Sequence, residues 1–410
     1  MAVKIIRQPK RIALIGAPSS AAALRAGHER APAALRAAGL VERLQAAGYE
    51  VADLGDCAPQ VFQVDDEHPR ARNLSAVLAA LHDLKPRVEQ AVKSGALPLV
   101  LGGDCIIALA TLAGVRRYYR NVSLVYVDRD ADLNLPATTP SGCVDGMVVA
   151  HIIGRGAPEL VRFWGESPLV REPDVALFGL DRLDPPEEAL LARSPMRRYT
   201  AADIQRDGAA AAAQAAIERI HVASHEFVLH FDVDAISSED FPATNFAAPG
   251  GLRLEDMRQA LEVFTSQKNL AAIEVTAYNP ELDPDGSAAK TLVDLLASVF
   301  AARRAALAGA EAPAATSVAV AAGPPANGAS AAPSAAAERE ASTESAASAA
   351  TSTAVAEPAS EPATEQETPA TTSSEPSSAE ASPHPSESTA DAATGSEETQ
   401  TPTEPETSSS

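Results

Sequence analysis

The chain has 410 residues and a formal net charge of −22, with 33 basic and 55 acidic side chains. Sixteen of the acidic residues but only one basic residue lie in segment 311–410, so this segment carries −15 and residues 1–310 carry −7. The acidic balance argues against nucleic acid as a partner, because binding nucleic acid requires basic patches. The lack of any apolar run of about 18 residues argues against a membrane partner.

The cysteines and the first residues bear on the compartment. Three cysteines, Cys57, Cys105 and Cys143, are too few and too scattered for a disulfide framework. Segment 1–11 contains basic residues but no apolar stretch with a small-residue cleavage site, so we expect no secretory signal. These observations predict a cytoplasmic protein.

Residues 1–307 alternate short apolar runs with amphipathic runs. The apolar runs predict about eight strands, at 11–15, 51–54, 97–101, 123–127, 175–178, 197–199, 227–231 and 270–273. The clearest helices are predicted at 32–47, 74–92 with a disturbance at Pro86, 254–265 and 288–307. Strand–helix alternation with continuous apolar strands predicts an α/β fold with a parallel sheet covered on both faces. An open doubly wound sheet and a closed barrel both fit, and both bind ligands at the carboxyl ends of their strands.

Residues 308–410 form a separate segment rich in Ala, Ser, Thr, Glu and Pro, without aromatic residues after position 300. Low hydrophobicity combined with charge of one sign buries too little apolar surface to offset chain entropy. We therefore expect two parts: a folded domain at 1–307 and a disordered acidic tail at 308–410.

Acidic residues follow several predicted strands. In chain order these strand ends carry Asp104 with Cys105, then Asp128, Asp130 and Asp132, then Asp232 and Asp234, and finally Glu274. Five aspartates at one sheet edge would repel one another unless cations neutralise them, so the pattern predicts a divalent metal cluster. A calcium loop at 128–139 is excluded, because its sixth position is Leu133 rather than Gly and its twelfth is Thr139 rather than Glu. Each motif alone would more often be an ordinary turn.

These motifs, in this order, resemble the arginase/agmatinase (ureohydrolase) family from about Ile12 to Phe300. The segments that carry the resemblance are 14–18, 33–40, 102–104, 128–134, 139–142, 179–187, 231–244, 250–251 and 274–280. The resemblance implies one three-layer α/β/α domain with a parallel, roughly eight-stranded sheet, which selects the open sheet over the barrel. It also implies a homo-oligomer, a trimer or a hexamer.

The resemblance further implies two manganese ions, with a hydroxide held between them that attacks a guanidinium carbon. Carried over by position, Asp128 and Asp232 would bridge both ions, Asp132 would bind the first and Asp234 the second. Glu274 would pair with the substrate guanidinium. The substrate would be a small guanidino compound that yields urea, or hydroxyurea, and an amine.

Loop residues point to the class of guanidino substrate. Where arginase-type members of the family hold the amino-acid end of arginine, this chain has Asn134, Thr139, Ser141, Asp184 and Glu187. Agmatine has no α-carboxylate, so these residues favour an arginine-type amino acid that would leave an ornithine-type amine. The competing interpretation is that they are ordinary polar loop residues.

The chain departs from the family at chemically important positions. Cys105 and Asp130 stand where the family has metal-binding histidines, Asp145 where it has a proton-shuttling histidine, Cys143 where it has a substrate-contacting asparagine, and Phe246 where it has a small threonine. Thiolate suits zinc, iron or cobalt better than manganese. Five aspartates and a thiolate carry −6 against +4 from two divalent ions.

Two interpretations stay open: a metal-dependent hydrolase with Asp145 as general acid, which we favour slightly, and a catalytically inactive arginase-fold protein with a binding or regulatory role.

Overall fold

A computed structural model describes residues 5–221 and 226–311. Within these residues the strands are β1 (Arg11–Ala17), β2 (Glu50–Asp56), β3 (Leu97–Gly102), β4 (Val122–Val127), β5 (Val175–Leu180), β6 (Arg197–Thr200), β7 (Glu226–Asp232) and β8 (Leu270–Thr276). They form one sheet in the order β2-β1-β3-β8-β7-β4-β5-β6, and every neighbouring pair is parallel. Strands β2 and β6 are the two edges, so the sheet is open and not a barrel.

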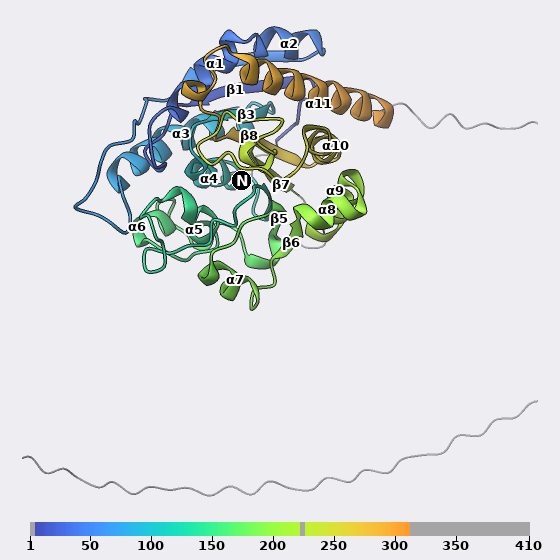
Figure 1. The fold of residues 1–410 in the computed structure, drawn as a ribbon. Helices are drawn as coiled ribbons and strands as arrows, with labels where there is room; N and C mark the ends of the chain where they lie inside the picture. The colour runs from blue at the N-terminus through green and yellow to red at the C-terminus, as the bar shows by residue number, and fades with distance from the viewer. Residues whose placement is uncertain (1–4, 222–225, 312–410) are drawn as a thin grey trace, which may run out of the picture. The chain divides into compact units, whose positions relative to one another are not determined.

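The helices connect the strands and cover the sheet. The α-helices are α1 (Ala31–Ala37), α2 (Leu40–Ala46), α3 (Leu74–Lys93), α4 (Ala108–Arg116), α5 (Val148–Ile152), α6 (Pro158–Val161), α7 (Pro185–Leu191), α8 (Ala201–Asp207), α9 (Ala209–His221), α10 (Leu254–Thr265) and α11 (Ser287–Glu311). Short 3-10 turns are η1 (His28–Arg30), η2 (Cys105–Ile107), η3 (Asp145–Met147), η4 (Glu172–Asp174), η5 (Val233–Ala235) and η6 (Pro280–Leu282). Figure 1 shows α3, α4 and α5 on one side of the sheet and α9, α10 and α11 on the other. The predicted three-layer α/β/α fold is confirmed.

Burial explains why the apolar runs became strands. Every residue of the inner strands β3, β4 and β5 is buried, whereas the edge strands β2 and β6 are largely exposed or half-buried. A parallel strand covered on both faces has no solvent side, so its sequence stays apolar throughout instead of alternating. The eight predicted runs therefore lie within, or overlap, the eight observed strands.

Three predicted boundaries differ from the structure. The helix expected at 32–47 is two helices, because Gly39 adopts a left-handed φ of 88° that ends the first and starts the second. Helix α3 continues through Pro86, where a disturbance was expected. Helix α11 passes the expected boundary at 307/308 and reaches Glu311; the rest of the predicted tail lies outside the described residues.

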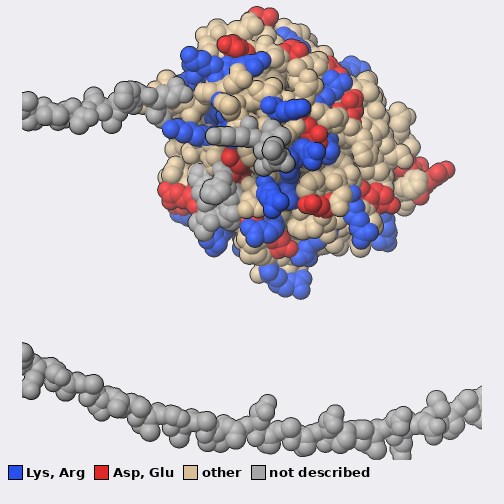
Figure 2. Space-filling model, turned by 180° about the vertical axis from the view of Figure 1, so that it is seen from behind, with Lys and Arg blue, Asp and Glu red and all other residues tan. Residues whose placement is uncertain are grey.

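Charge on the surface is mixed where the molecule is seen from behind. Figure 2 shows lysine and arginine side chains gathered across that face with aspartate and glutamate side chains between them. This mixture contrasts with the carboxylate-rich ends of the central strands. Of the helices in the described ranges, none combines the length and the apolar character needed to cross a membrane.

Candidate metal centre

The loops that follow β3, β4, β5 and β7 surround a cavity of about 360 Å³. Sequence-predicted site residues that line it are Cys105, Asp128, Asp130, Asp132, Asn134, Thr139, Ser141, Cys143, Asp145, Asp184, Glu187, Asp232 and Asp234. Ligand sites of open parallel sheets lie at the carboxyl ends of the strands, and this cavity follows that rule. Of the predicted site residues, Glu274 alone is not part of the lining.

Potential metal-binding atoms fall into two groups within the described part of the chain, each with all its atoms within 4.8 Å of one another. The first group is Cys105, Asp128, His230 and Asp232. The second group is Asp128, Asp130 and Asp234. Asp128 belongs to both, because the turn after β4 presents its carboxylate between them; its Oδ1 also accepts a hydrogen bond from the Asp130 N–H at 2.7 Å.

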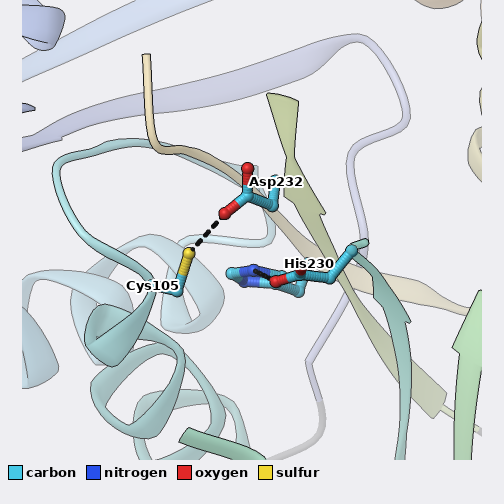
Figure 3. A group of neighbouring side chains, drawn as sticks. Cys105, His230 and Asp232 are labelled. Atoms are coloured by element: carbon cyan, nitrogen blue, oxygen red, sulfur yellow. Dashed lines mark hydrogen bonds and ion pairs between the residues drawn. The ribbon is translucent and has the colours of Figure 1, made fainter. Parts of the chain in front are cut away.

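Cys105 lies on the short turn η2 after β3, and its side chain points toward Asp232, another member of the first group. Its Sγ donates to Asp232 Oδ2 at 2.8 Å (Figure 3). The same sulfur lies 3.3 Å from Thr276 Oγ1. Burial, reinforced by the Asp232 carboxylate, raises the pKa of the Cys105 thiol well above its usual value. The Cys105 N–H donates to Asp145 Oδ1 at 2.7 Å, so Asp145 stands beside the first group without belonging to it.

His230 is a site residue that the motif analysis did not identify. It lies on β7 in register with Tyr126 of β4 and Glu274 of β8. The rings of Tyr126 and His230 stack with centroids 4.1 Å apart and an interplanar angle of 5°. His230 Nδ1 is 2.8 Å from Glu274 Oε1, and Nε2 is 3.4 Å from Thr276 Oγ1 and 4.0 Å from Asp128 Oδ2. Strand alternation puts residues 230 and 232 on one face of β7, but the contacts of His230 with Tyr126 and Glu274 depend on which strands are neighbours.

Glu274 does not occupy the position predicted for it. Its side chain is fully buried on β8, where Oε1 is bonded to His230 and Oε2 has no hydrogen-bond partner among the described residues. A carboxylate enclosed on β8 does not reach a molecule in the cavity. The structure therefore does not support the expected pairing of Glu274 with a substrate guanidinium, and the observed contact of Glu274 is with the His230 imidazole.

Asp132 lines the cavity but stands outside both groups of metal-binding atoms. Its Oδ2 accepts a hydrogen bond from the Tyr126 hydroxyl. Asp132 also adopts a left-handed backbone with a φ of 51°, a conformation that costs free energy for a residue other than glycine and that concentrates at functional sites. The loop after β4 thus holds Asp132 at the cavity wall through Tyr126.

Arg182 is the second site residue that the sequence analysis missed. It lies two residues beyond β5 and pairs with two of the three members of the second group, Asp130 after β4 and Asp234 after β7. Its Nε donates to Asp130 Oδ1 at 3.0 Å, and its Nη2 donates to Asp130 Oδ2 and, at 2.9 Å, to Asp234 Oδ2. Arg129 points elsewhere, with Nη1 donating to the Ala248 carbonyl at 2.7 Å, as strand alternation predicts.

The electrostatics of the cavity fit a bound cation. Burial, followed by repulsion from neighbouring carboxylates, raises the pKa values of Asp128, Asp132 and Asp232 well above their usual range. The same causes raise the pKa of Asp130 to about 7. One oxygen of Asp234, Oδ1, is buried and has no hydrogen-bond partner within the described part of the chain. A divalent cation would restore these carboxylates to their charged form, and the sulfur, nitrogen and oxygen donors present suit one.

The loop residues expected at the amino-acid end of a substrate hold one another. Glu187 Oε1 accepts from the Leu133 N–H and Oε2 from the Asp184 N–H, each at 2.8 Å. Asn134 Nδ2 donates to Asp184 Oδ2 at 2.8 Å. Asp184 and Glu187 thereby form the capping box at the start of α7. These bonds fix the segment after Asp132 against α7 and shape that wall of the cavity.

Segment 139–143 forms another wall of the cavity. Thr139 Oγ1 accepts from the Gly142 N–H at 3.0 Å, and Ser141 Oγ accepts from the Cys143 N–H at 3.1 Å. Cys143 Sγ donates to the Ala22 carbonyl at 2.8 Å. Both hydroxyl oxygens therefore accept bonds within their own turn, and each hydroxyl keeps its hydrogen as a donor for a ligand.

An open parallel sheet with sulfur, nitrogen and oxygen donors at its carboxyl edge defines an α/β protein with a candidate metal centre. The family model described as Arginase family matches residues 10–301, so the chain belongs to the arginase family. The arginase of Bacillus caldovelox is 33% identical over 298 residues, which cover 72% of this chain and 99% of that protein. Its solved structure gives a TM-score of 0.66 at 32% identity over 71% of this chain and 98% of that one. The arginase of Entamoeba histolytica in complex with L-ornithine gives 0.66 at 25% identity over 72% and 99%.

Proposed function

We propose that this protein is a metal-dependent hydrolase of a C–N bond in a guanidino or amidine substrate with an amino-acid end. An arginine-type amino acid would yield urea, or hydroxyurea, and an ornithine-type amine. One observation carries the proposal: a single cavity of about 360 Å³ is lined by the metal-binding atoms, Asn134, Thr139 and Ser141. Its similarity to arginases, one of them solved with L-ornithine, supports the same substrate class.

The residues of the cavity divide the work between cation binding, orientation and proton transfer. The clustered carboxylates attract a cationic guanidinium, and Ser141 and Thr139 offer hydroxyl donors to an α-carboxylate. A divalent ion held by Cys105 and its neighbours would supply activated water at neutral pH. Asp145 accepts a hydrogen bond from the Cys105 N–H and lines the cavity, and in this proposal it gives a proton to the departing amine. The thiol favours zinc, iron or cobalt, and manganese is the ion that the family resemblance implies.

A second candidate function is a catalytically inactive arginase-fold protein that binds a partner. The observation that favours it is Arg182, whose guanidinium already occupies carboxylate oxygens of Asp130 and Asp234 inside the cavity. A side chain of this kind competes with a guanidino substrate for the same acceptors. Turnover separates the two candidates.

The test is hydrolysis by the full-length chain loaded separately with manganese, iron, cobalt and zinc. We expect urea or hydroxyurea release from arginine or N-hydroxyarginine and much less from agmatine, which lacks the α-carboxylate. Asp145→Asn should lower kcat by about 100-fold through loss of proton transfer, with metal content unchanged. Glu239→Gln, a change at an exposed position outside the cavity, is the control. Metal-loaded protein that turns over none of these substrates would favour the binding protein instead.

Assembly and compartment complete the proposal. A trimer or hexamer is implied by the family, and sedimentation equilibrium would show it as a multiple of the 42.3 kDa chain. All three cysteines are buried and unpaired, which supports a reducing compartment such as the cytoplasm. Fractionation of the producing cells tests that location.

A further inference from the structure

We propose that this protein binds one metal ion rather than two, and that His230 supplies its imidazole ligand. The other ligands are Cys105, Asp128 and Asp232. This inference deepens the proposed function and rests on its metal site, but it makes a claim about ligands that can be measured without turnover. Neither metal-binding position at which the family has histidine carries an imidazole here, and His230 places one in the same cluster from a different strand.

The ring of His230 is held in the orientation that a metal ligand requires. Its Nδ1 is 2.8 Å from Glu274 Oε1, and this bond fixes the proton on Nδ1 because a carboxylate accepts. The Nε2 lone pair then faces the cluster. A ligating histidine characteristically donates its other ring N–H to a carboxylate, which sets the tautomer and raises the basicity of the ligand. Stacking on Tyr126 prevents the ring from turning away.

Distances within the first group are compatible with one ion. Four ligands arranged tetrahedrally at bond lengths of about 2.0–2.3 Å stand about 3.3–3.8 Å from one another. His230 Nε2 is 4.0 Å from Asp128 Oδ2, and Cys105 Sγ is 2.8 Å from Asp232 Oδ2. The second distance is shorter than the spacing of two ligands on one ion, so these two atoms would have to move apart on metal binding. Shifts of less than about 1 Å would complete the site.

Protein donors engage the second group. Both oxygens of Asp130 and Oδ2 of Asp234 accept hydrogen bonds from Arg182. The Arg182 guanidinium already supplies a positive charge to these three oxygens, and of the two carboxylates only Asp234 Oδ1 is left without a partner among the described residues. A metal ion here would have to displace this guanidinium or share its oxygens with it. The first group has no arginine or lysine on its ligand atoms among the described contacts. This difference assigns the single ion to the first group.

The alternative is a purely structural role, in which His230 and Glu274 form a hydrogen-bonded pair in the core without binding metal. Both residues are fully buried, and a buried pair of this kind stabilises a fold without binding metal. Under that alternative, substitution of His230 would change the stability of the metal-free chain but not the metal it binds. A control at a second buried histidine separates the two roles. His151 is suitable because its Nδ1 bonds the Met147 carbonyl at 2.7 Å and it belongs to neither metal-binding group.

The test uses the full-length chain stripped of metal and titrated with Co²⁺. We expect one ion per chain, a sulfur-to-cobalt charge-transfer band and the intense visible bands of four-coordinate cobalt. His230→Gln should weaken Co²⁺ binding by at least about 100-fold and alter the visible bands, and Glu274→Gln should weaken it by about 10-fold. His151→Gln should leave both unchanged. Cys105→Ser should remove the charge-transfer band.

X-ray absorption of the zinc-loaded wild-type chain gives a measurement that needs no variant. One sulfur and one imidazole in the zinc shell would support the proposal even if His230→Gln does not fold. Two ions per chain, a zinc shell without imidazole, or Co²⁺ binding unchanged in folded His230→Gln would each overturn it. The proposed function is judged separately, because turnover by a protein with any of these properties would leave the hydrolase intact and remove only this ligand assignment.

Discussion

Arg182 decides the charge balance of the site at the scale of single residues. Seven aspartates, one glutamate and two thiols line one cavity, and the sequence offers no excess of positive charge to compensate for them. Arg182 places a guanidinium between Asp130 and Asp234, with its side chain about one-third exposed. A cation of the protein thus performs part of the neutralisation that a second metal ion would otherwise supply.

Removal of the Arg182 guanidinium should lower the stability of the metal-free chain and increase the number of metal ions that it binds. We expect Arg182→Gln to lower the free energy of unfolding of the metal-free chain by about 2 kcal/mol, because it leaves two carboxylates without their cation. The same variant should bind a second divalent ion at the freed oxygens. Urea denaturation and metal analysis by mass spectrometry measure the two effects. Arg206→Gln, which removes an exposed arginine that does not line the cavity, is the control. An unchanged metal content in Arg182→Gln would contradict the argument.

The same residues show how far sequence could predict the site. Strand-end aspartates were predictable, because a parallel sheet gathers its carboxyl ends at one edge. His230 and Arg182 were not found, since their roles depend on which strands are neighbours: β7 lies between β4 and β8, and β5 lies beside β4. Glu274 was assigned by position alone. The register between β7 and β8, which cannot be read from a single sequence, places Glu274 opposite His230 on the neighbouring strand.

At the scale of elements, long periodic runs were predictable and their ends were not. Helix α10 was predicted at its observed bounds, Leu254–Thr265, because its apolar positions recur at helical spacing. The break between α1 and α2 depends on one glycine with a left-handed backbone, which outweighs an apolar pattern that continues across it. Helix ends are set by such local contacts, and some of these come from distant parts of the chain.

Asp240 makes such a contact with the first residue of α10, although it lies 14 residues earlier in the sequence. Its Oδ2 accepts from the Leu254 N–H at 2.9 Å, and its two oxygens pair with Arg253 at 2.7 Å. The Arg253 guanidinium, then the Leu254 N–H, lowers the pKa of Asp240 to about 2. A carboxyl whose pKa is depressed by folding contributes stability above its unfolded pKa and loses it as the pH falls towards the folded value.

We therefore expect Asp240→Asn to lower the free energy of unfolding by about 1 kcal/mol at pH 7, a magnitude typical of a lost helix cap. The difference from wild type should be complete above about pH 5 and should shrink as the pH falls, until most of it is lost at about pH 2. Denaturant titrations between pH 2 and pH 7 measure it. Glu239→Gln, at a neighbouring exposed carboxylate, should show little change at any pH. A difference that stays constant down to pH 2 would exclude the charge of Asp240 as its cause.

At the scale of the whole molecule, the described residues hold a complete fold. Both helical layers and the eight strands lie between Arg11 and Glu311, and the hydrophobic core extends from Ile12 to Phe300. Most of the net negative charge is carried elsewhere: segment 312–410 has 15 acidic residues and one basic residue, which is −14 of the −22 of the whole chain. Truncation of the chain after Glu311 would therefore remove most of the net negative charge and leave the hydrophobic core of the described residues intact.

A chain that ends at Glu311 should unfold at the same temperature as the full-length protein, within about 2 °C, because it keeps α11 and every core residue. A chain that ends at Ala302 loses Arg303, whose Nη1 donates to the Gln267 carbonyl at 2.9 Å, and the buried Leu307. We expect its Tm to fall by more than about 5 °C, because removal of the Arg303 donor leaves the Gln267 carbonyl unpaired and removal of Leu307 loses an apolar contact. Differential scanning calorimetry at matched ionic strength compares the three chains. A Tm that drops equally for both truncations would show that segment 312–410, and not the end of α11, contributes the stability.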